Sequence, residues 1–185
     1  MSKMSTKTMV AIALFASMAT ALMWFPKFPL LPAAPFLTYD FSDVPILIGS
    51  FALGPVAGIF MVTVKNLLYF ITRSQSGLIG TFMNWSTTLV FMLTATIIYH
   101  KVKKNKVGAL IGMIVGTVVF TIAAVYINIH IALPIWGIPT DNILPLVKSA
   151  VIPFNILRGI ISTAMTMLLY RRVSDLIRRV LKLEV

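Results

Sequence analysis

The sequence predicts an all-α membrane protein, a single bundle of six transmembrane helices with both termini in the cytoplasm. Three observations predict this class. Hydrophobic residues make up 58% of the 185 residues and mean hydropathy is +0.94, which leaves too little polar surface for a soluble globule. Apolar runs long enough to cross about 30 Å of hydrocarbon recur along the chain. The basic residues flank these runs.

The position of the charges explains the net charge of +11. Lysines and arginines gather before the first apolar run, between two later runs and after the last one, as cytoplasmic flanks of membrane helices do. These flanks can also contact anionic membrane lipid, so nucleic-acid binding is not expected. The chain has no cysteine, and its two histidines fall in different predicted helices, so we expect no metal site and no disulfide.

The first predicted helix covers about residues 8–25. Trp24, Phe25 and Pro26 stand where a signal peptide would need small residues, so this helix is expected to stay in the protein. Ala13, Ser17 and Ala21 recur at a spacing of four and form a face of small side chains that lets another helix approach. Packing within the bundle and docking of a partner are equally compatible with this face.

A loop follows, because four prolines between residues 26 and 42 forbid a helix. The loop is rich in Phe, Leu and Tyr, so we expect it to fold over the helix ends as a lid. Asp43 is interpreted as the cap of the next helix, with Ser42 as the competing candidate. Asp40 has no such simple explanation.

The run from Val44 to Ile71 has Lys65 as its only charge and is too long for one span of about 20 residues. Gly54 and Pro55 mark a turn, because proline is well placed in the first turn of a helix. The run is therefore predicted as two helices, 43–54 and 55–72. With two helices here, every basic flank lies on the cytoplasmic side, whereas one helix would place the basic loop at 101–106 outside.

Three further helices are predicted at about 78–99, 107–133 and 146–170, followed by a basic amphipathic tail at 171–185 on the membrane surface. All belong to one domain, residues 1–185. Gly108, Gly112 and Gly116 form a second face of small residues on the fifth helix.

Polar side chains fall at one depth in the outer half of four predicted helices. Polar groups inside a bilayer are costly and by default indicate a site facing the interior of the bundle. The alternative is that each amide bonds to a neighbouring helix, worth on the order of 1 kcal/mol. The number of such groups favours a ligand pocket, whereas the roles of Lys65 and Arg158 stay open. The group comprises Asn66, Asn84, Asn128, Lys148 and Asn155.

The residue types point to binding and not to catalysis. The sequence contains no carboxylate pair, no histidine with a nucleophile and no nucleotide-binding motif, so we expect neither an enzyme nor a resident cofactor. Asparagine amides suit a neutral heterocycle with alternating carbonyl and N–H groups. Aromatic side chains expected to stack on its faces are Phe36, Tyr39, Phe41, Trp85 and Trp136.

Three stretches resemble a known family: FLTYDFSDVPILIGSFALGPVAGIFMVTVKNLLYF, GLIGTFMNW and VKSAVIPFNILRG. They are similar to the substrate-binding S components of energy-coupling factor (ECF) vitamin transporters, in particular the riboflavin-specific branch. The resemblance implies a six-helix protein of the bacterial cytoplasmic membrane that captures riboflavin in an outward-facing pocket. It also implies docking on a transmembrane coupling subunit, EcfT, with two ABC-type ATPases.

The resemblance further implies a set of site residues. The family docks through an Ala-xxx-Ala pattern on its first helix, which corresponds here to Ala13, Ser17 and Ala21, with serine replacing the central alanine. Asn128 and Asn155 are assigned to the pyrimidine edge of the flavin ring, and Asp40 and Lys148 to the ribityl hydroxyls. The full set of expected ligand-binding residues is Thr38, Asp40, Asn84, Asn128, Lys148 and Asn155.

Three alternatives remain at this point. The nearest is an S component for another vitamin, such as folate, thiamine or biotin. A small ion-coupled carrier would need an intramembrane acid or inverted repeats, and neither is evident. A membrane enzyme lacks the catalytic groups it would need.

Overall fold

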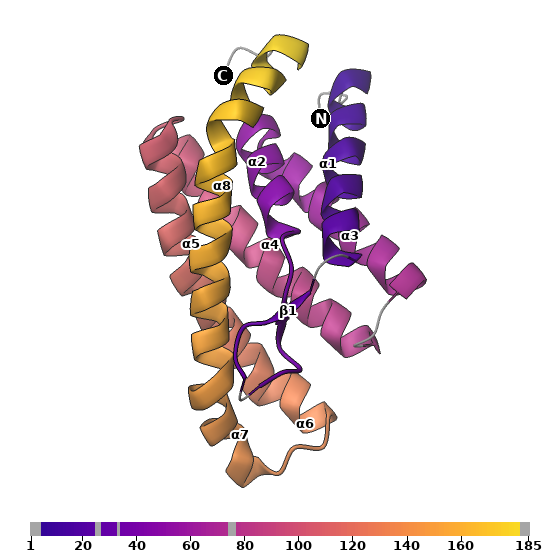
Figure 1. Cartoon of the computed structure of the whole chain (residues 1–185), viewed down its shortest axis with the longest axis vertical. Helices are drawn as coiled ribbons and strands as arrows, with labels where there is room; N and C mark the ends of the chain where they lie inside the picture. Colours follow the sequence, from indigo (N-terminus) through magenta and orange to yellow (C-terminus); the bar gives the residue numbers. More distant parts are fainter. Residues whose placement is uncertain (1–4, 25–26, 33, 74–76, 182–185) are drawn as a thin grey trace.

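The computed structural model of the chain describes residues 5–24, 27–32, 34–73 and 77–181, with the side chains of residues 73 and 171–181 outside the description. Nearly all of the described chain is helical (Figure 1). The elements are α1 Thr6–Trp24, β1 Phe28–Pro29, β2 Thr38–Tyr39, α2 Asp43–Leu53, α3 Pro55–Arg73, α4 Gly77–Val102, α5 Lys106–Ile127, η1 Asn128–Ala132, α6 Leu133–Ile135, α7 Thr140–Leu146, η2 Val147–Val151 and α8 Ile152–Leu181.

Five helical segments of the described chain are long and apolar enough to cross a membrane: Thr6–Trp24, Pro55–Thr72, Gly77–Val102, Lys106–Ile135 and Thr140–Tyr170. The predicted fold class, an all-helical membrane bundle, is confirmed. The remaining predicted helix, α2, is shorter. Its 11 residues extend about 16 Å at 1.5 Å per residue, roughly half the hydrocarbon thickness.

Helix α2 lies inside the bundle. Every residue from Asp43 to Phe51 is buried, and α2 packs against α1, α3, α4 and α8. The helix ends at Gly54, where φ is +92°, a backbone conformation that residues other than glycine rarely adopt. Helix α3 begins at Pro55, as the sequence predicts. Because α2 is enclosed by protein, its polar residues are held by neighbouring helices and not by water.

The glycine face of α5 packs against α4. A Cβ atom at Gly112 would lie 2.4 Å from the backbone oxygen of Ala95, and one at Gly116 would lie 2.9 Å from the ring of Phe91. These distances are shorter than any normal contact, so only glycine allows the two helices to come this close. The small-residue face noted in the sequence is thus where α5 approaches α4 at Gly112 and Gly116.

The proline-rich segment before α2 contains a structure that the sequence analysis did not predict. Two-residue strands pair in antiparallel fashion, Phe28 with Tyr39 and Pro29 with Thr38. The aromatic ring of Phe41 contacts both Phe28 and Tyr39 edge-on. This short hairpin runs in front of α4, between α1 and α8 (Figure 1), and gives the loop a fixed shape over the bundle.

The predicted ranges 107–133 and 146–170 imply two uninterrupted α-helices. The last two membrane segments of the structure differ from this prediction. Each contains a π-helical segment, η1 or η2. In η1 the N–H of Leu133 bonds to the carbonyl of Asn128, just before Pro134; in η2 the N–H of Ile152 bonds to the carbonyl of Val147, just before Pro153. Proline has no backbone N–H to donate, and in a regular α-helix its ring clashes with the carbonyl four residues earlier. A wider π-helical turn ahead of the proline relieves this clash.

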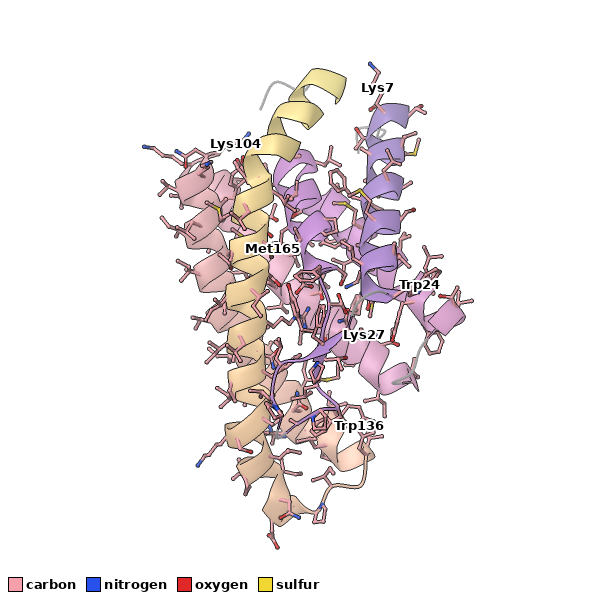
Figure 2. The ribbon with its side chains drawn as sticks, viewed as in Figure 1. Lys7, Trp24, Lys27, Lys104, Trp136 and Met165 are labelled. Carbon is pink, nitrogen blue, oxygen red and sulfur yellow. The ribbon has the colours of Figure 1, made fainter. Side chains whose placement is uncertain are left out.

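Both ends of the described chain lie at the same end of the bundle (Figure 1). Lys7, near the start of α1, and Lys104, between α4 and α5, lie at this end too (Figure 2). Helix α8 continues to Leu181 without a break. The predicted amphipathic surface of the tail at 171–185 lies outside the described side chains and stays a prediction.

Candidate ligand-binding site

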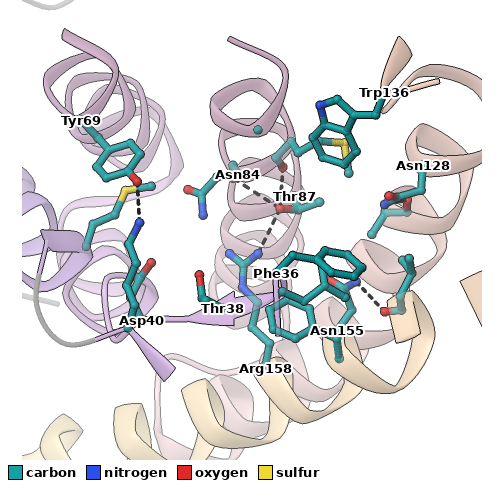
Figure 3. Close-up of a pocket in the computed structure, with 18 residues that line it drawn as sticks. Phe36, Thr38, Asp40, Tyr69, Asn84, Thr87, Asn128, Trp136, Asn155 and Arg158 are labelled. Atoms are coloured by element: carbon teal, nitrogen blue, oxygen red, sulfur yellow. Dashed lines mark hydrogen bonds between the residues drawn. The ribbon is translucent and has the colours of Figure 1, made fainter. Parts of the chain in front are cut away.

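A cavity of about 150 Å³ lies beneath the hairpin, between α3, α4, η1 and α8. One buried water needs only about 10–15 Å³, so the cavity is much larger than a packing defect. Its polar lining comes from four helical elements and the loop that covers them, and Figure 3 shows these side chains converging on the same space. The polar side chains are Lys27, Thr38, Asp40, Tyr69, Asn84, Thr87, Asn128, Asn155 and Arg158.

The floor of the cavity is a buried ion pair between α8 and α2. The guanidinium of Arg158 donates from Nε to Oδ2 of Asp43 at 2.8 Å and from Nη2 to Oδ1 at 2.9 Å. Arg158 also donates to Thr87 and Thr88 of α4. The interpretation of Asp43 as a helix cap is therefore wrong, because its carboxylate is used by Arg158, and Ser42 makes no side-chain cap bond either.

The loop is held to this floor. The hydroxyl of Tyr39 lies 3.2 Å from that of Ser162, which in turn donates to Asp43. Burial raises the pKa of the Tyr39 phenol, and the charge of Asp43 raises it further, so the hydroxyl stays protonated at neutral pH. The Oδ1 atom of Asp40 accepts a bond from the backbone N–H of Ser42 at 2.9 Å. Asp40 thus stabilises the turn that leads into α2.

Lys65 of α3 joins the loop to α4. Its side chain has no exposed surface, so the ammonium does not extend to the membrane boundary, as long lysine side chains often do. The ammonium donates to Oγ of Ser42 at 3.2 Å and to Oδ1 of Asn84 at 2.9 Å.

Two amides on the opposite side of the cavity are fixed by their own helices. The Nδ2 atom of Asn128 donates to the carbonyl of Ala124, and that of Asn155 donates to the carbonyl of Val151, both at 2.8 Å. Each amide keeps its oxygen and one N–H free of protein partners among the described residues. Asn128 opens η1 and Asn155 follows η2 by one turn, so both amides sit next to irregular helix, as residues of functional sites often do.

Two aromatic side chains predicted to stack on a ligand line the cavity. Phe36 of the loop and Trp136, after α6, face it from opposite elements (Figure 3). Trp85 does not reach the cavity, because its indole N–H donates to Thr63 of α3 at 3.2 Å. Tyr39 bonds to Ser162 of α8 and Phe41 packs against Tyr39, and neither lines the cavity.

The structure brings together five of the predicted ligand-binding residues and leaves out the sixth. Lys148 is exposed and does not line the cavity. In a regular α-helix, residues seven apart share a face, but Lys148 lies within the wider turn of η2, which changes its direction relative to Asn155. Asn66, which the sequence grouped with these amides, donates to Val62 and lines a different hollow, between α3 and α4. The five that line the cavity are Thr38, Asp40, Asn84, Asn128 and Asn155.

Sequence reasoning missed several lining residues. Arg158 follows Asn155 by three positions, which places both on one helical face, so this spacing could have found it. Lys27 donates to the hydroxyl of Tyr69 at the edge of the cavity. No periodic signal links a loop lysine to a tyrosine 42 residues later.

The predicted docking residues lie on the outer face of α1. Ala13, Ser17 and Ala21 are exposed, whereas Ala16 and Ala19 on the other side of the helix are fully buried. Internal packing of α1 therefore uses the opposite face.

The arrangement suits binding of an uncharged solute. The buried carboxylate of Asp43 is neutralised by Arg158, Lys27 and Asp40 are bonded to Tyr69 and Ser42, and most of the other polar groups of the cavity are amides and hydroxyls beside aromatic rings. Within the described part of the chain, no three histidine, aspartate or glutamate side chains come together as a metal site. Fold and cavity together define a multi-pass membrane protein that binds a small molecule.

Comparison with known proteins identifies the family. The family model for the ECF transporter, substrate-specific component, matches residues 7–170. The riboflavin transporter RibU of Staphylococcus aureus (strain TCH60) is 36% identical over 180 residues, with 94% of each chain covered. The riboflavin transporter FmnP of Bacillus subtilis (strain 168) is 31% identical, covering 90% of this chain and 92% of the relative.

A solved structure, described as "Structure and mechanism of the S component of a bacterial ECF transporter", superposes with a TM-score of 0.80 at 37% identity. The match covers 93% of this chain and 98% of that one. The chain belongs to the family of substrate-specific components of ECF transporters. It is a multi-pass protein of the cell membrane, and the family consists of transport components and not of enzymes, as the sequence predicted.

Proposed function

We infer that this chain is the riboflavin-specific S component of an ECF-type importer. The observation that carries this inference is the cavity itself, in which amides from three helices and two aromatic side chains meet under the hairpin. The relatives named above are riboflavin transporters over nearly the whole length of the chain. A flavin needs flat apolar contacts and several hydrogen-bonding partners, and the cavity offers both.

The two ends of the cavity suit the two parts of riboflavin. Phe36 and Trp136 flank the end where Asn128 and Asn155 lie, and this end accommodates the isoalloxazine ring with its pyrimidine edge towards the amides. Thr38 and Asp40 lie towards the other end and suit the ribityl hydroxyls (Figure 3).

Import requires an energy source that this chain does not contain, because its sequence has no nucleotide-binding motif. The S component docks on a coupling subunit, EcfT, which is energised by two ATPases. The face formed by Ala13, Ser17 and Ala21 is the proposed contact, since its small, exposed side chains permit close approach of another helix. Both termini and the basic loop around Lys104 face the cytoplasm and its anionic lipids.

The test is a binding experiment on the purified protein in detergent. Absorption spectra of the preparation should show a flavin band, and a thermal-shift panel of riboflavin, thiamine, folate and biotin should give a large shift with riboflavin alone. Ligand binding raises the melting temperature by mass action. A colourless protein stabilised by thiamine, folate or biotin would overturn riboflavin specificity while leaving the family intact.

A further inference from the structure

Lys65 is a buried charge with no direct salt bridge in the described part of the chain. Its exposed fraction is zero, and the buried carboxylate of Asp43 is bound by Arg158. The two groups that accept from its ammonium, Ser42 Oγ and Asn84 Oδ1, are neutral. A buried ammonium held only by neutral groups is costly in a membrane protein, which points to a use beyond stability.

The contact between Lys65 and Asn84 fixes the direction of the amide. An ammonium group has only donors, so Asn84 must turn its oxygen towards Lys65. The NH₂ group of Asn84 is then the part of the amide left for the cavity that this residue lines. Asn128 and Asn155 have the opposite arrangement, because their nitrogen atoms donate to their own helices and their oxygens are free.

Asn84 lies apart from the aromatic end of the cavity. In Figure 3 it lies on the side of Tyr69 and Asp40, whereas Phe36, Asn155 and Trp136 lie towards the other side. A donor fixed at the polar end recognises an acceptor on whatever part of the ligand reaches that end. In the proposed function, that part is the ribityl chain, whose hydroxyl oxygens accept hydrogen bonds.

We propose that Lys65 is a positioning residue for substrate specificity: its ammonium holds Asn84 as an oriented donor that selects a hydroxylated substituent on the ligand. The proposal rests on the proposed function, because it assigns the ribityl chain to this end of the cavity. Lys65 itself does not touch the ligand; it acts through Asn84. The same ammonium binds Ser42, so the orientation of Asn84 is coupled to the loop that covers the cavity.

The experiment compares riboflavin with lumiflavin, which has a methyl group in place of the ribityl chain. Affinities of the full-length protein in detergent are measured by flavin fluorescence, with melting temperatures in parallel. Lys65→Met removes the ammonium at similar side-chain length. Asn84→Asp keeps an acceptor for Lys65 but removes the donor. Asn66→Leu is the matched control, because Asn66 is a buried amide beside Lys65 that does not line the cavity.

We expect Lys65→Met and Asn84→Asp to weaken riboflavin binding at least about tenfold, the effect of losing an oriented hydrogen bond inside a closed site. Lumiflavin binding should stay within about threefold of the parent protein, and Asn66→Leu should leave the riboflavin-to-lumiflavin ratio unchanged. The melting temperature of Asn84→Asp should not fall, since a carboxylate pairs well with Lys65.

Different failures have different meanings. If the parent protein binds no riboflavin, the proposed function fails. If the parent binds riboflavin and lumiflavin equally, or if Lys65→Met weakens both ligands to the same extent, Lys65 is structural and the inference is overturned while the function stands. Should lumiflavin binding be too weak to measure, Asn84→Asp decides: unchanged riboflavin affinity refutes the proposal, and a tenfold loss at unchanged melting temperature supports it.

Discussion

Asp43 and Arg158 show how strongly single residues depend on each other in this interior. The carboxylate of Asp43 accepts four hydrogen bonds, two from Arg158, one from Thr88 and one from Ser162. Replacing Asp43 by Asn leaves the guanidinium without a counter-charge, and loss of one partner of a buried pair typically costs about 3–5 kcal/mol. We expect Asp43→Asn to lower the free energy of unfolding by about this amount, measured by denaturation in detergent.

The double variant Asp43→Asn with Arg158→Met is the control for this prediction. It removes both charges, so it should be more stable than Asp43→Asn alone. Equal stability of the single and double variants would show that the pair does not act as a unit.

Asn155 provides the residue-scale test of the ligand site. Replacing it by Leu removes an oxygen and an N–H that have no other described partner, and it leaves the bundle packing in place. We expect riboflavin binding to weaken at least about tenfold, with little change in melting temperature. Titration of flavin fluorescence measures this, with Asn66→Leu as a buried amide outside the cavity. Unchanged affinity would remove Asn155 from the site.

The sequence identified single residues well where depth in the membrane decided their role. Asn84, Asn128 and Asn155 line the cavity, whereas Asn66 and Lys148, grouped with them because of the same predicted depth, do not. Asp43 was misinterpreted because a local rule, helix capping, was applied to a side chain whose partner lies 115 residues later. Such pairing between α2 and α8 leaves no local pattern.

At the scale of elements, α1 carries a prediction about assembly. Its face of Ala13, Ser17 and Ala21 is exposed, so a bulky side chain there should not disturb the bundle. We expect Ser17→Trp to abolish copurification with the coupling subunit and ATPases while riboflavin affinity stays within about twofold of the parent, because close helix approach requires small residues.

The matched control for Ser17→Trp is Leu168→Trp, at a position of α8 that is 72% exposed. It adds the same ring to a different membrane-facing surface and should leave copurification intact. If both variants assemble normally, α1 is not the docking element.

Most helices could be predicted because their apolar runs and the Gly54–Pro55 break follow general rules. The hairpin of β1 and β2 could not, since proline and aromatic residues in a loop give no alternating pattern and the two strands have only two residues each. The π-helical segments were missed as well. They explain why Lys148 is exposed, although it lies seven residues before Asn155 and would share its face in a regular α-helix.

For the whole molecule, the testable property is orientation in the membrane. The chain has no cysteine, so single cysteines can be introduced and labelled with membrane-impermeant reagents in intact cells. Asp141→Cys, in α7 at the end of the bundle opposite the termini, should react from outside. Lys104→Cys should react only after the cells are opened, because basic loops stay in the cytoplasm. The reverse pattern would contradict the proposed topology.

The charged floor of the cavity also bears on how transport responds to voltage. Asp43 and Arg158 form an ion pair whose charges neutralise each other. An electric field does work of about 2.3 kcal/mol per 100 mV only on a net charge that crosses it. Riboflavin is uncharged and the Asp43–Arg158 pair carries no net charge, so neither should make uptake depend on the membrane potential.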